Sequence, residues 1–339
     1  MNTPQAARLT FVGAGNHSTE CLYPNIAHIP EFDLVAVCDL DEAKAQRAAK
    51  VYGAPEHFTD LGIMLDKVAP DGVCVCGMPD AHYLVGLEVL QRGLPVFMEK
   101  PPAWTAEETA QLVAAAETQG TFGMVGFMKR FAPANLVAKD YIENGEFGGL
   151  NSLAMIHGSG PYDDIRRMLL FNAIHMLDLG RFFAGNLAEV FAHRSPEGSR
   201  VQAVSMSFRY ANGVVGQMNI NSSVSWVDCF EQVYLSGDGA AILVDASRET
   251  HLMAADRQFA SPAGTRLCGW GSRYYVSGNL SGWAAGGHYT RGYHGELEHF
   301  AKAVLGQVAP VATLEDALKA MELIDAIMES LETGQPVGL

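Results

Sequence analysis

Apolar runs and helical patterns alternate regularly over the first 125 residues of the chain. Runs typical of buried parallel strands occupy residues 9–12, 34–38, 72–76, 96–98 and 122–127. The segments between them favour helices, one of which begins with the capping box Thr-Ala-Glu-Glu at 105–108 and should end at Gly120. This alternation predicts an α/β fold, with a doubly wound parallel sheet in a first domain spanning residues 1–125.

The pattern changes in the rest of the chain. After a helical connector at 133–144, apolar and polar residues alternate with period two at 204–210 and 214–220, on either side of the hairpin turn Asn212-Gly213. A second turn at 236–239 separates two further strands, and helices are expected around 175–183, at 296–305 and after Thr313. We therefore predict a second α/β domain, residues 126–339, with an open, mostly antiparallel mixed sheet. One face of this sheet is half-polar, so this face is exposed to solvent, binds a ligand or is covered by another subunit.

Residues 261–291 have weak periodicity and are rich in Gly, Ser, Trp and Tyr. They are expected to form a long loop bordering the active site, or else an irregular edge of the sheet.

Composition excludes several classes of partner. The formal net charge of −15 disfavours nucleic acid and anionic membranes. No apolar run has the length of a membrane span, and the polar N-terminus does not resemble a signal peptide. The six cysteines form no Cys-x-x-Cys pair. We therefore expect a cytoplasmic protein with no membrane or nucleic-acid partner.

A glycine-rich turn follows the first predicted strand. The sequence Gly13-Ala14-Gly15-Asn16-His17-Ser18 has the form G-x-G-x-x-S. Gly13 would allow a tight turn, and Gly15 would let the backbone approach a pyrophosphate at a helix N-terminus. An ordinary glycine-rich turn is the alternative.

Asp39 ends the second predicted strand, about 24 residues after Gly15. A carboxylate at this place accepts hydrogen bonds from the adenine ribose and disfavours a 2′-phosphate, so NAD is favoured over NADP. Alternatively Asp39 caps the next helix, a role that Asp41 could also fill.

Glu99 and Lys100 stand where the strand 96–98 should end, and Pro101 restricts the backbone of Lys100. Ligands of open α/β sheets bind at the carboxyl ends of strands. A lysine held there could accept or donate a proton, whereas the alternative is a surface ion pair between neighbours.

A helix is expected to begin near Ala81 with Asp80 as its N-cap. One face of this helix should carry Leu84, Leu87 and Leu90.

Several segments in one order, spanning nearly the whole chain, resemble the glucose–fructose oxidoreductase/inositol dehydrogenase family, often called Gfo/Idh/MocA. They are Gly13-Ala14-Gly15-Asn16, Asp39, Met78-Pro79-Asp80-Ala81-His82, Glu99-Lys100-Pro101, Gly-Phe-Met-Lys-Arg-Phe-Ala-Pro at 126–133, Ala-Ile-His-Met-Leu-Asp at 173–178, Gly-Glu-Leu-Glu-His-Phe at 295–300 and Glu-Asp-Ala at 315–317. The resemblance implies a Rossmann domain followed by an α/β domain with a mixed sheet. It also implies NAD(P)-dependent oxidation or reduction of a sugar, cyclitol or related compound. Such proteins often form homodimers or homotetramers through the C-terminal sheet.

The resemblance also implies roles for single residues. Lys100 takes the place of the catalytic lysine, and His175 takes the place of the catalytic histidine, as the base or as a residue that holds the hydroxyl. The residues implied at the cofactor are Gly13, Ala14, Gly15, Asn16, His17, Asp39, Met78, Pro79, Asp80, His82, Glu99 and Lys100. The substrate candidates are Arg130, Tyr162, Tyr293 and His294.

Some of these residues have structural alternatives. His82 could serve in helix capping, and Arg130 could pair with an acid. Asp178 could meet Arg181 in an ion pair on the same helix.

One position departs from the family pattern. Family members commonly place an aspartate four residues before the histidine, where this chain has Phe171. Either the alignment slips by one residue and Asn172 replaces the acid, or the site lacks this carboxylate. Asp163 and Asp164 could compensate, although a solvated loop turn is the plainer interpretation.

Two other functions remain open. Some proteins of this family cleave glycosidic bonds through transient oxidation by a tightly held NAD, and others are dinucleotide-binding regulators without catalysis. The eleven histidines are scattered, so no metal site is expected.

Overall fold

The computed structural model describes residues 6–144, 147–196, 198–224, 230–254, 266–268, 271–275 and 287–339. The chain forms two compact units, one within residues 1–128 and 282–318 and the other within 129–281 and 319–339. The expected domain boundaries, 1–125 and 126–339, stay a prediction.

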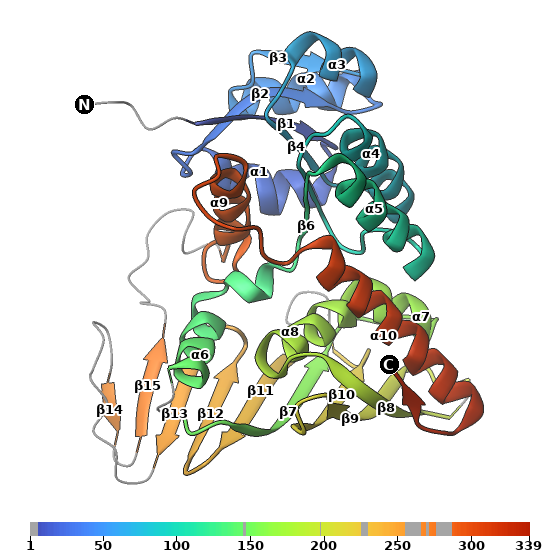
Figure 1. Ribbon diagram of the computed structural model, residues 1–339, viewed down its shortest axis with the longest axis vertical. Coiled ribbons are helices and arrows are strands. Elements are labelled where there is room, and N and C mark those ends of the chain that lie inside the picture. The colour runs from blue at the N-terminus through green and yellow to red at the C-terminus, as the bar shows by residue number, and fades with distance from the viewer. Residues whose placement is uncertain are drawn as a thin grey trace. The chain divides into compact units, whose positions relative to one another are not determined.

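The first unit contains a six-stranded sheet in which every neighbouring pair is parallel (Figure 1). Its strand order is β3-β2-β1-β4-β5-β6. Successive strands are added on one side of β1 as far as β3 and then on its other side from β4 onward, so the strand order switches between β1 and β4. The strands are β1 (Ala7–Val12), β2 (Phe32–Cys38), β3 (Glu56–Phe58), β4 (Gly72–Val75), β5 (Val96–Met98) and β6 (Gly123–Val125). The predicted doubly wound parallel sheet is confirmed.

Helices connect these strands, and local sequence signals set their ends. The helical segments are η1 (Ser18–Leu22), α1 (Tyr23–Ile26), α2 (Glu42–Tyr52), α3 (Leu61–Val68), α4 (Pro79–Gln91) and α5 (Ala106–Gln119). Asp41 caps α2, because its side chain accepts hydrogen bonds from the backbone of Ala43 and Lys44. The predicted capping box at Thr105 and Glu108 is present, and α5 ends at the left-handed Gly120.

Two expectations about α4 were wrong. Met78 is the N-cap and Asp80 lies one position inside the first turn, because Pro79 begins the helix. Leu90 is buried as expected, but Leu84 is 63% exposed, and the rest of the buried face runs through His82, Gly86 and Val89. A buried histidine and a glycine occupy core positions of this helix. A search for apolar residues at helical spacing finds neither, because neither residue is counted as apolar.

The helix α9 (Tyr293–Val304) belongs to the first unit although it follows the second sheet in sequence. Phe300 of α9 is fully buried, and its ring lies 5.9 Å from that of Phe97 on β5. The buried face of α9 therefore completes the core of this unit beside β1 and β5.

The second unit contains a ten-stranded sheet with the order β14-β15-β13-β12-β11-β7-β10-β9-β8-β16. Its neighbours are antiparallel except for the parallel pair β7 and β10. The strands are β7 (Leu150–Gly158), β8 (Leu187–Arg194), β9 (Ala203–Tyr210), β10 (Val215–Asn221), β11 (Phe230–Gly237), β12 (Ala240–Asp245), β13 (Glu249–Ala254), β14 (Arg266–Cys268), β15 (Gly271–Tyr275) and β16 (Val337–Gly338). The predicted mixed, mostly antiparallel sheet is confirmed.

Helices cover one face of this sheet, with α6 against β12 and β13 and α8 against β7 (Figure 1). The helical segments are η2 (Met128–Phe131), α6 (Pro133–Glu143), α7 (Ile165–Met168), η3 (Leu169–Ala173), α8 (Ile174–Ala184) and α10 (Leu314–Thr333). The expected helix around 175–183 is confirmed as α8, whereas α7 and η3, which precede it, were not predicted. The division between the two units falls within α10.

The opposite sheet face, here called the outer face, carries partly exposed apolar side chains. They are Ile156, Val215, Phe230, Tyr234 and Met253, which share a face by strand register and are 40–54% exposed.

The expected loop at 261–291 contains β14 and β15, which extend the sheet beyond β13. A loop throughout this stretch was therefore wrong, and the alternative of a sheet edge fits β14 and β15, because backbone pairing with β13 forms strands where side-chain alternation is weak. Residues 261–265, 269–270 and 276–286 lie outside the described residues.

Candidate active site

The glycine-rich turn closes tightly on the end of β4. Gly13 has φ +100°, and a Cβ atom there would lie 1.9 Å from the carbonyl oxygen of Cys76, so only glycine fits. A Cβ on Gly15, in contrast, would meet no atom within 4 Å. Gly13 therefore makes the turn, while the backbone at Gly15 faces open space that a pyrophosphate could approach.

Asp39 at the end of β2 is tied to this turn. Its Oδ2 accepts a hydrogen bond from the Ala14 N–H at 2.7 Å, and its Oδ1 accepts one from the Asp41 N–H at 2.9 Å. Because Asp41 is the N-cap of α2, the capping alternative for Asp39 is not realised. The carboxylate instead joins the second strand to the glycine turn, where an acidic residue can face a ribose.

The Glu99 carboxylate is almost completely buried, with 2% exposure, at the carboxyl end of β5. The Glu99 N–H donates to the Val75 carbonyl at 2.9 Å, and the Lys100 N–H donates to Glu99 Oε2 at 3.1 Å. His17 of the glycine turn places Nε2 3.4 Å from Glu99 Oε1. Burial alone would raise the pKa of Glu99, but the ion-pair contact with His17 and the charge of Lys100 outweigh it and lower that pKa.

His82 fixes the segment that follows Lys100. The Gly77 N–H donates to His82 Nε2 at 2.9 Å, so Nδ1 carries the proton and donates to the Pro101 carbonyl at 2.8 Å. Burial lowers the pKa of His82 and keeps the ring neutral. The Lys100–Pro101 peptide bond is cis. His82 therefore supports the backbone on which the half-buried Lys100 side chain stands.

The other implied cofactor residues lie in the glycine turn and at the start of α4. Asn16 is exposed beside Gly15, and Met78 and Asp80 are exposed around the buried Pro79.

The first turn of α9 lies beside the glycine turn. The Tyr293 ring meets the His17 ring edge-on, with 5.9 Å between centroids. Glu296 is fully buried, and neither of its carboxyl oxygens has a hydrogen-bond partner among the described residues. Burial, with the nearby Glu99, raises the pKa of Glu296 well above its usual value, so this acid stays neutral. Tyr293 and His294, proposed from the sequence as substrate residues, thus belong to the first unit, and a substrate contact for them stays a prediction.

A buried polar cluster occupies the helix-covered side of the second sheet. Glu231 on β11 forms an ion pair with Lys129 and accepts a hydrogen bond from Ser247. His157 on β7 places Nδ1 3.7 Å from Glu231 Oε2, and its Nε2–H donates to Asn172 Oδ1. Burial alone would raise the pKa of Glu231, but the charges of Lys129 and His157 outweigh it and lower the pKa to about 2.

Sequence reasoning missed three of these residues: Lys129, His157 and Glu231. Lys129 lies inside the family-like segment 126–133. His157 and Glu231 stand at inward positions of their strands, among apolar side chains. A polar residue at an inward position of a strand was the sequence signal that could have identified His157 and Glu231.

His175 is buried near the start of α8, directly after the π-helical turn η3. A π turn holds one more residue than an α turn, and such turns occur often at functional sites. Phe171 and Asn172 both lie in this turn. Asn172 contacts His157, and its role as the replacement for the acid stays a prediction.

Arg130 is engaged by a buried acid. It donates to both oxygens of Asp178, from Nε at 2.7 Å and from Nη2 at 2.6 Å. Arg181 lies farther from Asp178, with 3.9 Å between Nη1 and Oδ1. The acid-pairing alternative for Arg130 is therefore realised, and a substrate contact stays a prediction. Such a bidentate pair rigidly joins η2 to α8.

Tyr162 and its neighbours lie in a pocket of the second unit, with Arg194, Arg200 and Gln202 also in its wall. Asp164 caps α7 by accepting a hydrogen bond from the Arg167 N–H at 2.7 Å. A structural role thus explains Asp164 without catalysis, while a substrate contact for Tyr162 stays a prediction.

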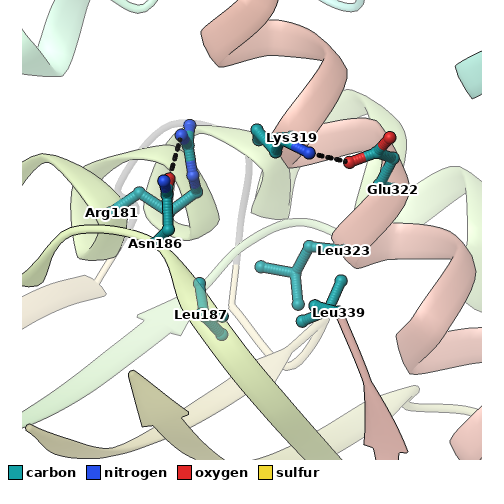
Figure 2. A pocket seen from close by; sticks show the side chains of 7 residues that line it. All are labelled: Arg181, Asn186, Leu187, Lys319, Glu322, Leu323 and Leu339. Atoms are coloured by element: carbon teal, nitrogen blue, oxygen red, sulfur yellow. Dashed lines mark hydrogen bonds and ion pairs between the residues drawn. The ribbon is translucent and has the colours of Figure 1, made fainter. Parts of the chain in front are cut away.

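Figure 2 shows another pocket of the second unit, lined by Arg181, Asn186, Leu187, Lys319, Glu322, Leu323 and Leu339. Arg181 donates to Asn186 Oδ1 and Lys319 donates to Glu322 Oε2, each at 2.9 Å. The volume of about 210 Å³ is smaller than that of usual small-molecule sites. We assign no ligand to this pocket because its cations are already paired.

The described residues offer no group of three or more His, Cys, Asp or Glu side chains that could hold a metal ion. Among these residues, too, no helix combines the length and apolar character that crossing a bilayer requires.

Comparisons with known proteins give consistent results. A family model described as an oxidoreductase family with an NAD-binding Rossmann fold matches residues 7–127, and the model of the family's C-terminal alpha/beta domain matches residues 167–339. D-glucoside 3-dehydrogenase of Escherichia coli (strain K12) is 29% identical over 201 residues, which are 54% of this chain and 55% of that protein. The chain thus matches only about half of this relative's length.

A second relative matches over nearly its full length. The scyllo-inositol 2-dehydrogenase (NAD(+)) of Bacillus subtilis (strain 168) is 23% identical, covering 93% of this chain and 91% of that protein. Among solved structures, a dehydrogenase from Chromobacterium violaceum superposes with a TM-score of 0.86 at 23% identity, covering 98% of this chain and 97% of that one. At this identity the structural likeness supports the fold alone.

Proposed function

The chain belongs to the Gfo/Idh/MocA family of oxidoreductases, and from that premise we propose that it is a nicotinamide-dependent dehydrogenase of a sugar, cyclitol or related polyhydroxy compound. The observation that carries this proposal is the anchoring of Lys100. It stands at the carboxyl end of β5, where parallel sheets bind ligands, and Glu99 and His82 hold its backbone from both sides.

The glycine turn and Asp39 fit a dinucleotide. Open space beside Gly15 suits a pyrophosphate, and the Asp39 carboxylate suits a ribose with free hydroxyls. When bound, the nicotinamide would supply or accept the hydride. We propose NAD as the preferred form, because a carboxylate at Asp39 repels a 2′-phosphate.

The protein's own part of the chemistry is to hold and move the proton of the reacting hydroxyl. We propose that Lys100 Nζ exchanges that proton. His175 is the second group, which holds the hydroxyl or accepts its proton. In the second unit, Asn172, His157 and Lys129 present amide, imidazole and ammonium groups in one cluster. Several oriented polar groups together suit a substrate with several hydroxyls.

A substrate screen tests this proposal. The purified protein is mixed with cyclitols, aldoses and glucosides in the presence of NAD or NADP, and absorbance in the reduced-nicotinamide band is followed. We expect at least one polyhydroxy compound to reduce NAD, with NADP used less efficiently. If no compound reduces either cofactor, the dehydrogenase proposal fails. A cofactor that stays bound through purification without net reduction would instead support glycoside cleavage by transient oxidation.

A further inference from the structure

The Glu99 carboxylate lies between two segments of the first unit that the dinucleotide proposal uses. Its Oε2 accepts the backbone N–H of Lys100, and its Oε1 lies 3.4 Å from His17 Nε2. The Glu99 side chain is 3% exposed, while that of His17 is 45% exposed. A buried carboxylate needs partners for its charge, and the imidazole of His17 is the cation that reaches it from the glycine turn.

We propose that Glu99 and His17 form a positioning pair, in which the imidazolium of His17 ties the glycine turn to the backbone of Lys100. This inference rests on the proposed binding of a dinucleotide. Two consequences follow. The pair holds the cofactor turn and the strand-end lysine in one arrangement. It also places a positive charge two residues after Gly15, where an anionic pyrophosphate would benefit from it.

The groups that face His17 come from three elements. Cys21 lies on the same turn in η1, Glu99 follows β5, and Tyr293 belongs to α9. Burial alone would lower the pKa of His17, but the Glu99 carboxylate at 3.4 Å and the nearby Cys21 outweigh it and raise the pKa to about 10.

Three further titratable groups lie near Glu99, namely His82, Lys100 and Glu296. His82 is neutral, and Lys100 adds a positive charge. Glu296 is kept neutral by burial, so the negative charge that faces His17 belongs to Glu99. The pair thus consists of one anion and one cation across the physiological pH range.

The first test measures the charge of His17 directly. Histidine ring signals of the full-length protein, labelled with ¹³C at the imidazole, are followed by NMR from about pH 5 to 10 and assigned with H17Q. We expect the His17 ring to stay protonated well above pH 7 in the wild type, and to titrate near its ordinary value in E99Q. A His17 midpoint near 6.5 in the wild type would overturn the proposal. This readout needs neither cofactor nor substrate.

The second test measures NADH affinity by fluorescence between about pH 6 and 9. We expect wild-type affinity to change little over this range, and E99Q to lose affinity as its histidine deprotonates. H17Q should bind roughly five- to tenfold more weakly at every pH, as expected for loss of a half-exposed ion pair beside an anion. H193Q, which alters an exposed histidine on β8, is the matched control and should match the wild type.

The outcomes separate this inference from the proposed function. If H17Q binds NADH with the same affinity and the same pH profile as the wild type, the positioning pair is overturned. A wild-type protein that does not bind NADH would overturn it as well. If NADH binds as expected, H17Q weakens it and no polyhydroxy compound is oxidised, the pair stands and the dehydrogenase proposal fails. Because His17 is half exposed, H17Q should fold, and an unchanged melting temperature verifies this.

Discussion

At the scale of single residues, three buried glutamates differ in what surrounds their carboxyl groups. Glu99 faces His17 and Lys100, and Glu231 is paired with Lys129, so both stay ionised. Glu296 has no hydrogen-bond partner among the described residues and stays neutral. Burial acts in the same direction on all three, and nearby cations decide which of them carry charge.

Replacing Lys100 with methionine should reduce turnover by about 10²- to 10⁴-fold, as for loss of a general acid–base group. NADH binding should persist, because the glycine turn and Asp39 are untouched. Turnover is measured with the substrate found in the screen, and binding by fluorescence. K44M, which removes an exposed lysine of α2 in the same unit, is the control. Near-normal activity in K100M would show that the assignment is wrong.

Glu231 should make the second unit sensitive to acid. Its folded-state pKa of about 2 lies below the ordinary value of 4.5, so the stabilisation is present above pH 4.5 and lost as pH falls through 2. E231Q should remove this pH dependence and lower the free energy of unfolding at pH 7 by about 3 kcal/mol, because Lys129 is left buried without its anion.

Urea unfolding followed by circular dichroism at several pH values measures both effects. E189Q disrupts an exposed pair with Arg209 in the same sheet and should cost less than about 1 kcal/mol. An E231Q protein with wild-type stability and acid response would contradict this account.

At the scale of elements, the glycine turn after β1 assigns different tasks to its two glycines. G13A should destabilise the fold by at least about 3 kcal/mol, because its Cβ would overlap the Cys76 carbonyl in an unfavourable backbone conformation. G15A should leave the melting temperature nearly unchanged but weaken NADH binding, since its methyl group would enter the space beside the turn. Calorimetry and fluorescence titration measure the two effects. Equal melting temperatures for both variants would refute this division of tasks.

The elements also show how far sequence patterns reach. Five of the six strands of the first sheet could be predicted because each is a continuous apolar run closed by a turn signal, and the ends of α5 followed from Thr105 and Gly120. The sixth, β3, was missed because its sequence Glu-His-Phe forms no apolar run. The Glu99–Lys100 strand end could be located in the same way. The partner of Glu99 could not, because His17 comes from a distant turn and no local pattern encodes that contact. The π turn η3 before His175 was not predicted, because a π turn breaks the 3.6-residue period.

At the scale of the whole molecule, the outer face of the second sheet is the feature that calls for a partner. Ile156, Phe230 and Tyr234 come from neighbouring strands and are each 40–47% exposed. Gln232 lies between Phe230 and Tyr234 and opposite Ile156, so apolar and polar side chains share this face, as at many protein interfaces. We propose that a second copy of the chain covers it, as the family resemblance implies.

Light scattering coupled to gel filtration should give the mass of a homodimer or homotetramer. The double substitution I156E/Y234E should shift the protein towards the monomer, because charges replace apolar contacts. I63E, which alters a 61% exposed side chain on α3, should leave the mass unchanged. A monomeric wild type at micromolar concentration would refute the proposed interface.

The parallel pairing of β7 with β10 has a consequence for how the protein is made. β7 ends at Gly158, whereas the strands on its two sides begin only at Val215 and Phe230. At roughly 5–20 residues per second, β7 is synthesised several seconds before either neighbour. During that interval both its backbone edges are open to strands of other nascent chains. Rapid overproduction in a cell should therefore send part of this protein into inclusion bodies, and slower translation should recover it.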